Sequence, residues 1–141
     1  VGKIGIADEI LLAGEDLSDT KDQVLRQHTQ IGHHLLEKST SEYLQMAAEI
    51  CLYHHERYDG LGYPQGVKGN EIPLSARIVA VADVFDALST KRPYKPAFPT
   101  DRCFAIMEEE RGTHFDPVVL DAFLARRQDI IHIQMEYVDI A

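Results

Sequence analysis

The chain has 141 residues and a formal net charge of −9, with 45% hydrophobic and 26% charged residues. This length fits one domain that can bury a core without disulfides or a structural metal, and the acidic balance argues against a nucleic-acid polymer as partner. The two cysteines, Cys51 and Cys103, lie far apart, and no apolar run is long enough to span a bilayer. We therefore expect a cytoplasmic protein with reduced thiols and no membrane insertion.

The first predicted helix begins near Ser18 or Asp19 and continues to residue 36. Its apolar stripe recurs at the spacing of one helical face and consists of Val24, Leu25, His28, Ile31, Leu35 and Leu36. His28 is therefore expected to face inward. A single inward histidine is usually a hydrogen-bonded core residue, so His28 alone does not indicate a site.

A second helix is predicted from about Glu42 to Arg57, with Tyr43 and Met46 on its apolar face. It delivers two adjacent histidines, His54 and His55, at its C-terminal end. Neighbouring helical side chains point about 100° apart, so two histidines serve one site best near a helix end. The alternative is a favourable interaction of both rings with the negative end of the helix dipole.

A glycine-rich loop follows the two histidines. Gly60 and Gly62 allow a sharp turn that could carry Tyr63 back over the histidines, and Pro64 would stiffen it.

Pro73 fits the first position of a third helix, in which the run from Arg77 to Leu88 is apolar nearly all round. Asp83 and Asp86 interrupt this run about one turn apart. A buried carboxylate without a partner is costly, so both residues are expected to face a cation or strong donors. A metal ion would meet this need, and a salt bridge from another element is the alternative.

The densest basic cluster, Lys91 to Pro96, comes next and is either a solvated loop or a phosphate clamp. A helix capped by Thr100 follows. A turn that includes His114 then leads to a last helix with Asp116 as its cap and Pro117 at its first position. The tail from residue 130 to 140 fits either a short strand or a helical extension.

Four inward polar residues thus come from three predicted helices: His28, His54, His55 and Asp83. Mixed imidazole and carboxylate ligation suits iron or manganese, and also zinc or nickel, better than magnesium or calcium. Four ligands are few for two metal ions.

The order of these motifs resembles the HD-GYP domain of the HD phosphohydrolase superfamily. The resemblance rests on the runs from His54 to Pro64, Ile72 to Leu88 and Arg92 to Lys95, and it extends over essentially the whole chain. It implies an all-α helical bundle of the HD-domain type, with residues 1–141 as the catalytic domain. It also implies metal-assisted hydrolysis of cyclic di-GMP, to the linear dinucleotide or GMP, by two or three divalent ions, with iron or manganese expected.

The resemblance assigns roles to particular residues. The expected metal ligands are His28, His54, His55 and Asp83. The residues expected to hold the dinucleotide are Tyr63, Arg92 and Lys95. Lys3 and Asp86 are expected catalytic residues: Lys3 matches the lysine that ends the family's His-Asp-x-Gly-Lys motif, and Asp86 would lie just outside the ligands or near the attacking water.

One departure from the family pattern concerns the start of the chain. Val1 matches the x of His-Asp-x-Gly-Lys, so the His-Asp pair is expected immediately upstream, in a missing N-terminal part of the domain. An upstream receiver or sensor domain is also expected. A diguanylate-cyclase-type protein or a second copy of the chain is a further expected partner.

Two other functions stay open. The substrate could be another cyclic dinucleotide, such as a mixed GMP-AMP ring, or a different phosphoester. Alternatively, the chain could be a module that binds a nucleotide or a partner protein without hydrolysing it.

Overall fold

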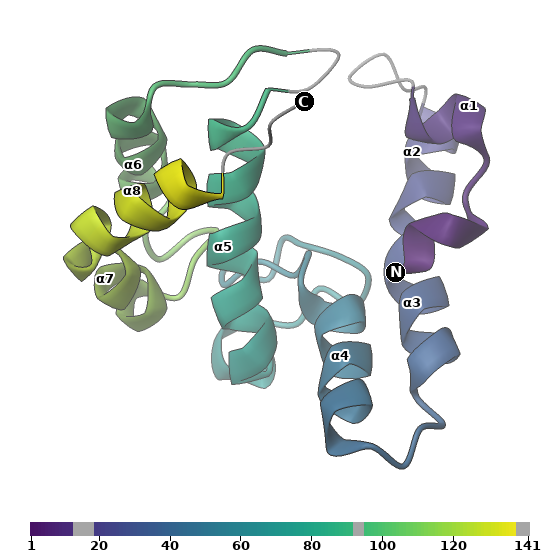
Figure 1. The fold of residues 1–141 in the computed structure, drawn as a ribbon. Helices are drawn as coiled ribbons and strands as arrows, with labels where there is room; N and C mark the ends of the chain where they lie inside the picture. The colour runs from purple at the N-terminus through teal and green to yellow at the C-terminus, as the bar shows by residue number, and fades with distance from the viewer. Residues whose placement is uncertain (13–18, 92–94, 138–141) are drawn as a thin grey trace.

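A computed structural model describes residues 1–12, 19–91 and 95–137 of the chain (Figure 1). Over these ranges the chain forms helices, turns and loops, with no strand and with an isolated β-bridge between Arg111 and Phe115. The predicted all-α class is confirmed. None of the helices in these ranges has the length and apolar character needed to cross a membrane.

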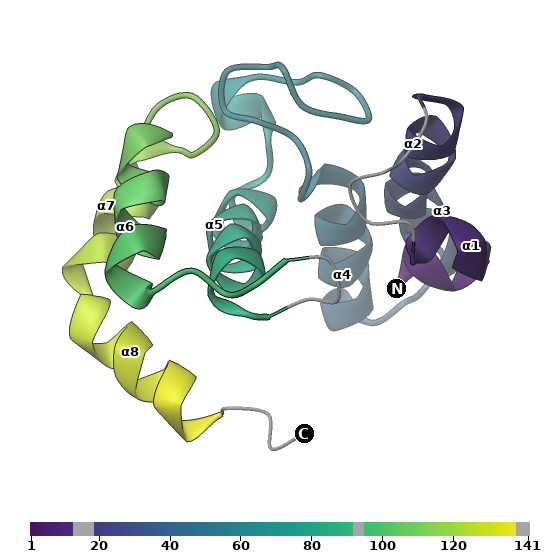
Figure 2. The ribbon, with the colours of Figure 1, turned by 90° about the horizontal axis from the view of Figure 1, so that it is seen from above.

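The helices form two groups around a central pair. The first half contains the 3-10 helix η1 (Gly2–Gly5) and the α-helices α1 (Asp8–Leu11), α2 (Asp19–Arg26), α3 (His28–Leu36) and α4 (Glu42–Tyr53). The second half contains the 3-10 helix η2 (Gly69–Glu71) and the α-helices α5 (Leu74–Ser89), α6 (Thr100–Glu109), α7 (Pro117–Ala125) and α8 (Arg127–Glu136). Helices α4 and α5 lie in the middle, with α1 to α3 beyond α4 and α6 to α8 beyond α5 (Figures 1 and 2).

The main apolar core lies between α5 and the C-terminal helices. Val81 and Phe85 of α5 pack there with Cys103, Phe104, Met107, Phe115 and Leu120. The Phe85 and Phe104 ring centroids are 5.3 Å apart, which is within the range of favourable aromatic pairs. This core packs one face of α5 against the C-terminal helices.

The first predicted helix is interrupted at Gln27, which separates α2 from α3. At this point, Nδ1 of His28 lies 2.7 Å from the Leu25 carbonyl oxygen, and the Thr29 hydroxyl donates to the Arg26 carbonyl at 3.1 Å. Side chains that bond to nearby carbonyls in this way compete with regular helical bonding. The stripe predicted for one continuous helix is therefore divided between α2 and α3.

The predicted apolar face of the α3–α4 pair is wrong at its far end. Leu35, Tyr43 and Met46 are 59%, 87% and 56% exposed. Helices α3 and α4 pack along each other and α5 covers part of α4, but the end of the pair near residues 37–41 extends beyond α5 (Figure 1). Periodicity located the helices, but it could not indicate how far their neighbours reach.

The helix boundaries agree with the predictions to within a few residues. Pro73 and Pro99 each directly precede the first residue of a helix, so the predictions of Pro73 as a first helical residue and of Thr100 as a cap are wrong by one position. The predicted cap at Asp116 is confirmed. Its carboxylate accepts from the Val118 N–H at 2.8 Å, and Pro117 is the first residue of α7. Within the described part of the tail, residues 130–136 belong to helix α8, so the helical alternative is correct there, and residues 138–140 lie outside the described ranges.

A buried ion pair joins α5 to the start of α7. Arg77 donates to the Asp116 carboxylate at 2.6 Å and to the Ile72 carbonyl at 2.8 Å, and the Asp116 side chain is only 5% exposed. Burial alone would raise the pKa of Asp116, but the hydrogen bonds from Arg77 and from backbone N–H groups outweigh it and lower the pKa. The pair therefore favours the charged carboxylate.

We expect Arg77→Ala to lower the free energy of unfolding by about 3 kcal/mol, because it leaves a buried carboxylate without its cation. Urea denaturation measures this change. The control is Arg111→Ala, since Arg111 pairs with Asp121 at the surface with both side chains about half exposed, and such pairs contribute about 1 kcal/mol or less. The pKa of Asp116 is lower in the folded than in the unfolded protein. The charged carboxylate therefore adds to the free energy of unfolding at neutral pH, and this contribution is lost as pH falls below about 4. Equal losses in the two variants would contradict this account.

Candidate metal centre and substrate site

Three histidines meet where α3 begins and α4 ends. His28 is the first residue of α3, His54 directly follows the last residue of α4, and His55 lies in the next turn. Nδ1 of His33 lies 3.1 Å from the Ala48 carbonyl oxygen, which ties α3 to α4 and helps to bring the three rings together. The prediction that His28 faces inward is confirmed, as is the position of the adjacent histidines at a helix end.

The three rings are close enough to serve one ion. The ring centroids lie 5.6 Å apart for His28 and His54, 4.9 Å for His28 and His55, and 4.1 Å for His54 and His55. One ligand atom from each ring lies within 4.8 Å of the other two. Imidazole nitrogens gathered at this spacing are typical of a transition-metal site.

Backbone hydrogen bonds decide which nitrogen of each ring faces the centre. His28 Nδ1 bonds the Leu25 carbonyl, and His54 Nδ1 lies 2.9 Å from the Ile50 carbonyl and 3.0 Å from the Cys51 carbonyl. A carbonyl only accepts, so Nδ1 carries the proton in both rings and Nε2 keeps its lone pair. In the described part of the chain, Nε2 of His28 is buried and has no hydrogen-bond partner. A divalent metal ion fits this atom, because it would supply the missing partner.

The surroundings keep the His28 and His55 rings neutral. Burial lowers the pKa of His55 to about 3, and electrostatic interactions with His54, His28, Lys3 and His114 act in the same direction. Burial also lowers the pKa of His28, against the raising effect of its backbone hydrogen bond. Both rings are therefore uncharged at neutral pH, the state that binds a metal ion.

The glycine loop returns over the histidines, as its sequence predicts. Gly60 has φ of +84°, and Gly62 passes so close to the chain that an added Cβ would lie 2.4 Å from the Arg57 nitrogen. The Tyr63 N–H then donates to the His55 carbonyl at 3.2 Å. The Tyr63 ring stacks on the His55 ring with centroids 5.0 Å apart and planes 12° apart.

Glu56 is a loop-stabilising residue beside the site that the sequence analysis missed. It is 2% exposed, and its carboxylate accepts from the Gln65 N–H at 2.6 Å and from the Gly66 N–H at 3.0 and 3.2 Å. These bonds close the far side of the glycine loop. Its position beside two histidines was the only sequence signal, and it gave no indication of these backbone partners.

We expect Glu56→Ala to lower the free energy of unfolding by about 2 kcal/mol, because it removes the acceptor of two backbone N–H groups. Chemical denaturation measures this loss. Glu56→Gln keeps one acceptor oxygen and should lose less. Unfolding curves that coincide for Glu56→Ala and the parent would show that the loop does not depend on this carboxylate.

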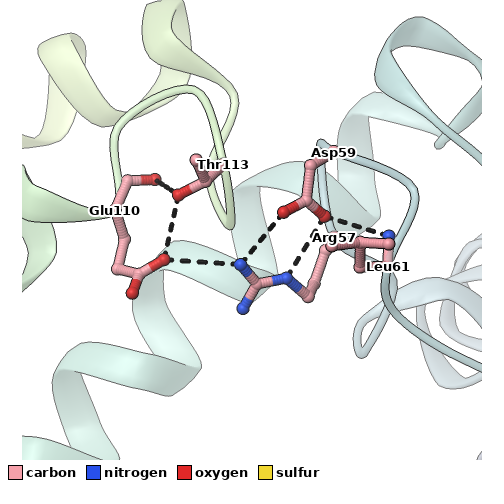
Figure 3. Close-up of polar contacts among 5 residues, drawn as sticks. All are labelled: Arg57, Asp59, Leu61, Glu110 and Thr113. Atoms are coloured by element: carbon pink, nitrogen blue, oxygen red, sulfur yellow. Dashed lines mark hydrogen bonds and ion pairs between the residues drawn. The ribbon is translucent and has the colours of Figure 1, made fainter.

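A polar network fixes the base of the glycine loop against the turn before α7 (Figure 3). Arg57 donates to Asp59 at 3.1 and 3.2 Å and to Glu110 at 3.4 Å, and the Thr113 hydroxyl donates to Glu110 at 2.9 Å. The Asp59 carboxylate also accepts from the Leu61 N–H at 3.0 Å. The network links the loop to the helices that form the main core.

Backbone bonds accompany this network and explain the role of His114. The Tyr58 N–H donates to the His114 carbonyl at 3.1 Å, and the Asp59 N–H donates to the Thr113 carbonyl at 2.8 Å. The His114 ring stacks on Phe115 with centroids 4.5 Å apart. His114 therefore serves the turn, as predicted, and its ring also faces the histidine cluster closely enough to influence the charge of His55.

The two aspartates of α5 are not buried, so that prediction is wrong. Asp83 and Asp86 are both exposed. Asp83 lies close enough to Tyr63 and His114 for its charge to act on both. It does not join the compact group of three histidines among the described residues, so its role as a ligand stays a prediction.

The remaining predicted site residues are Lys3, Asp86, Lys95 and Arg92. The positive charge of Lys3 acts on His28 and His55, so Lys3 borders the cluster. Asp86 accepts a hydrogen bond from the Thr90 hydroxyl at 3.3 Å. The Lys95 ammonium lies 5.1 Å from the centre of the Phe98 ring. Arg92 lies outside the described residues.

Comparisons with known proteins identify the family of the chain. A family model described as an HD domain matches residues 1–119. A cyclic di-GMP phosphodiesterase of Vibrio cholerae is 45% identical over 146 residues, which cover 100% of this chain and 30% of the relative. A cyclic di-GMP phosphodiesterase response regulator of Xanthomonas campestris is 48% identical over 133 residues, which cover 94% and 35%. The chain thus spans about a third of the length of the curated relatives it matches.

A solved structure shares the fold. It is that of a cyclic GMP-AMP-specific phosphodiesterase of Vibrio cholerae, with a TM-score of 0.57 and 19% sequence identity. The match covers 94% of this chain and 33% of the solved chain. The helical arrangement is therefore of the HD-domain type.

Proposed function

This chain belongs to the HD domain family, and from that premise we propose that it is the catalytic part of a metal-dependent phosphodiesterase that hydrolyses cyclic di-GMP. The observation that carries the proposal is the convergence of three imidazoles, one of which stacks on Tyr63, with the buried Nε2 of His28 left without a partner. Two relatives named as cyclic di-GMP phosphodiesterases, each more than 40% identical, support the choice of substrate.

The histidine cluster would hold the metal ions. His28, His54 and His55 offer nitrogen ligands, and Asp83 would add a carboxylate from α5. This donor set favours iron or manganese, and two or three ions would need further ligands from the expected upstream His-Asp pair. When bound, such ions supply Lewis-acid stabilisation of a phosphate and a water nucleophile at neutral pH.

The protein's own residues bind and orient the dinucleotide. Burial raises the pKa of Tyr63 to about 12, so its hydroxyl stays protonated at neutral pH and can donate to a phosphate oxygen. Lys3 beside the cluster would balance negative charge on the reacting phosphate. Arg92 and Lys95 would hold the second half of the substrate, and Asp86 would orient groups near the attacking water.

A mixed GMP-AMP ring is the second candidate substrate, because the solved structure with this fold is a cyclic GMP-AMP-specific enzyme. Competition between the two cyclic dinucleotides for the metal-loaded full-length protein tests the ranking. The proposal predicts a higher kcat/KM for cyclic di-GMP, measured by chromatography of the linear products. A higher value for the mixed ring would reverse the ranking, and hydrolysis of neither would reject both substrates.

The proposal also places the chain in a larger signalling protein. The relatives are about three times longer, and one of them is named a response regulator, which supports an upstream receiver or sensor domain. Cys51 and Cys103 are both free thiols, which is consistent with the reducing cytoplasm. A diguanylate-cyclase-type protein or a second copy of the chain would be a partner of the whole protein.

A further inference from the structure

The Tyr63 ring is held from α2 as well as from the histidine cluster. The guanidinium carbon of Arg26, the last residue of α2, lies 4.6 Å from the centre of the Tyr63 ring. A guanidinium at this distance from an aromatic centre makes a favourable cation–π contact. The same ring stacks on His55. Residues from α2 and from the turn after α4 therefore both contact Tyr63.

Arg26 is itself fixed in place. Its Nε donates to the Asp22 carboxylate at 2.8 Å, one turn earlier on α2, while half of its side-chain surface is exposed. An ion pair this exposed adds little to stability. Its clearer effect is geometric, because it holds the guanidinium plane at one end of the long, flexible side chain.

The hydrogen-bonding capacity of the Tyr63 hydroxyl is not used by the described part of the chain. Within the ranges that the structure describes, Tyr63 contacts its neighbours through its backbone N–H and its ring faces, and no hydrogen bond engages the hydroxyl. Where that hydroxyl points depends on the ring, and so on the groups that contact the ring.

We propose that Arg26 is a positioning residue, which holds the Tyr63 ring against His55 so that the tyrosine hydroxyl meets the substrate in one orientation. This inference rests on the proposed function, because Tyr63 is there a substrate contact. Arg26 acts through Tyr63 and makes no independent contact with the dinucleotide. It therefore couples α2, which leads into the first histidine, to the glycine loop that covers the site.

A double-mutant cycle tests this role. Arg26→Ala, Tyr63→Ala and the double variant are compared in the metal-loaded full-length protein. The readouts are the Kd of a phosphorothioate analogue of cyclic di-GMP, and KM and kcat for cyclic di-GMP. Loss of a cation–π contact of ordinary strength should raise Kd and KM about 2- to 30-fold for Arg26→Ala, with kcat nearly unchanged.

The double variant decides between positioning and direct contact. If Arg26 acts through Tyr63, the double variant binds no more weakly than Tyr63→Ala alone. If the two losses multiply, Arg26 contacts the substrate independently and the inference is overturned. Unchanged affinity in Arg26→Ala overturns it as well.

Matched variants separate positioning from a general effect on the fold. Arg126→Ala removes an exposed arginine that pairs with Asp129 at the start of α8, and it should leave Kd and KM unchanged. Asp22→Asn should shift Kd in the same direction as Arg26→Ala but less, and Arg26→Lys should recover part of the affinity. Helical circular dichroism and metal content should match the parent in all of them.

A readout without substrate keeps this inference distinct from the proposed function. In protein with ¹³C-labelled tyrosine rings, Arg26→Ala should shift the Tyr63 ring resonances and Arg126→Ala should not. A shift together with no binding of any cyclic dinucleotide by the parent would reject the proposed function and the substrate role of Arg26. Unmoved Tyr63 resonances would reject the positioning contact itself.

Discussion

Replacing His54 with alanine is expected to remove bound metal and to lower phosphodiesterase activity at least about 100-fold, since even residues that only orient metal ligands are worth 10- to 100-fold. His54 Nδ1 is engaged by two backbone carbonyls, so its Nε2 is the atom that faces His28 and His55. Elemental analysis after reconstitution gives the metal content, and chromatography of cyclic di-GMP products gives the activity.

The matched control is His34→Ala. His34 lies on α3, the same helix as His28, but its side chain is 72% exposed and pairs with Glu37. Metal content and activity should equal those of the parent. A His54→Ala protein that keeps its full metal content would remove His54 from the ligands. The same measurement on Asp83→Ala decides whether this exposed aspartate binds metal in the loaded protein.

Replacing Gly62 with alanine is expected to raise KM about tenfold or more while metal content stays near that of the parent. The added Cβ would lie 2.4 Å from the Arg57 nitrogen and 2.6 Å from the His55 carbonyl oxygen. Both are backbone atoms that cannot rotate away, so the loop must shift and carry Tyr63 off the His55 ring. A displacement of about 1 Å in a positioned group can lower a rate about 100-fold. A rise in KM of about tenfold is therefore a reasonable expectation for a shifted Tyr63 ring.

Steady-state kinetics and metal analysis of Gly62→Ala measure this effect. Leu61→Ala is the control, because the Leu61 side chain is 79% exposed and its backbone bond to Asp59 is retained. A parental KM in Gly62→Ala would mean that the position of Tyr63 does not limit substrate binding.

The sequence predicted the histidine cluster because the strongest signals for it are local. Adjacent histidines at the end of an apolar helical run, followed by closely spaced glycines and a Tyr-Pro pair, are read over eleven neighbouring residues, from His54 to Pro64. His28 could be added because its apolar stripe continues across the break at Gln27. The three histidines accordingly meet in the structure.

The predictions from sequence were wrong or incomplete where burial and contacts depend on segments far apart in the chain. Asp83 and Asp86 sit in an apolar run, yet Leu74 and Ile78 of the same helix are also 55% and 51% exposed. The apolar run therefore led us to predict that more of the α5 surface is buried by neighbouring helices than the structure shows. The roles of Glu56 and Arg26 depend on loops that return through space, which no periodicity encodes.

The central claim is that the histidine cluster supports metal-dependent hydrolysis of a cyclic dinucleotide. The most direct test reconstitutes the full-length protein, including the expected upstream His-Asp pair, with Fe(II) or Mn(II) without oxygen and follows cyclic di-GMP by chromatography. We predict the linear dinucleotide or GMP from the metal-loaded parent, and neither product after chelation or from His54→Ala. Absence of turnover in protein that contains bound metal would contradict the claim and favour a different phosphoester substrate or a binding module.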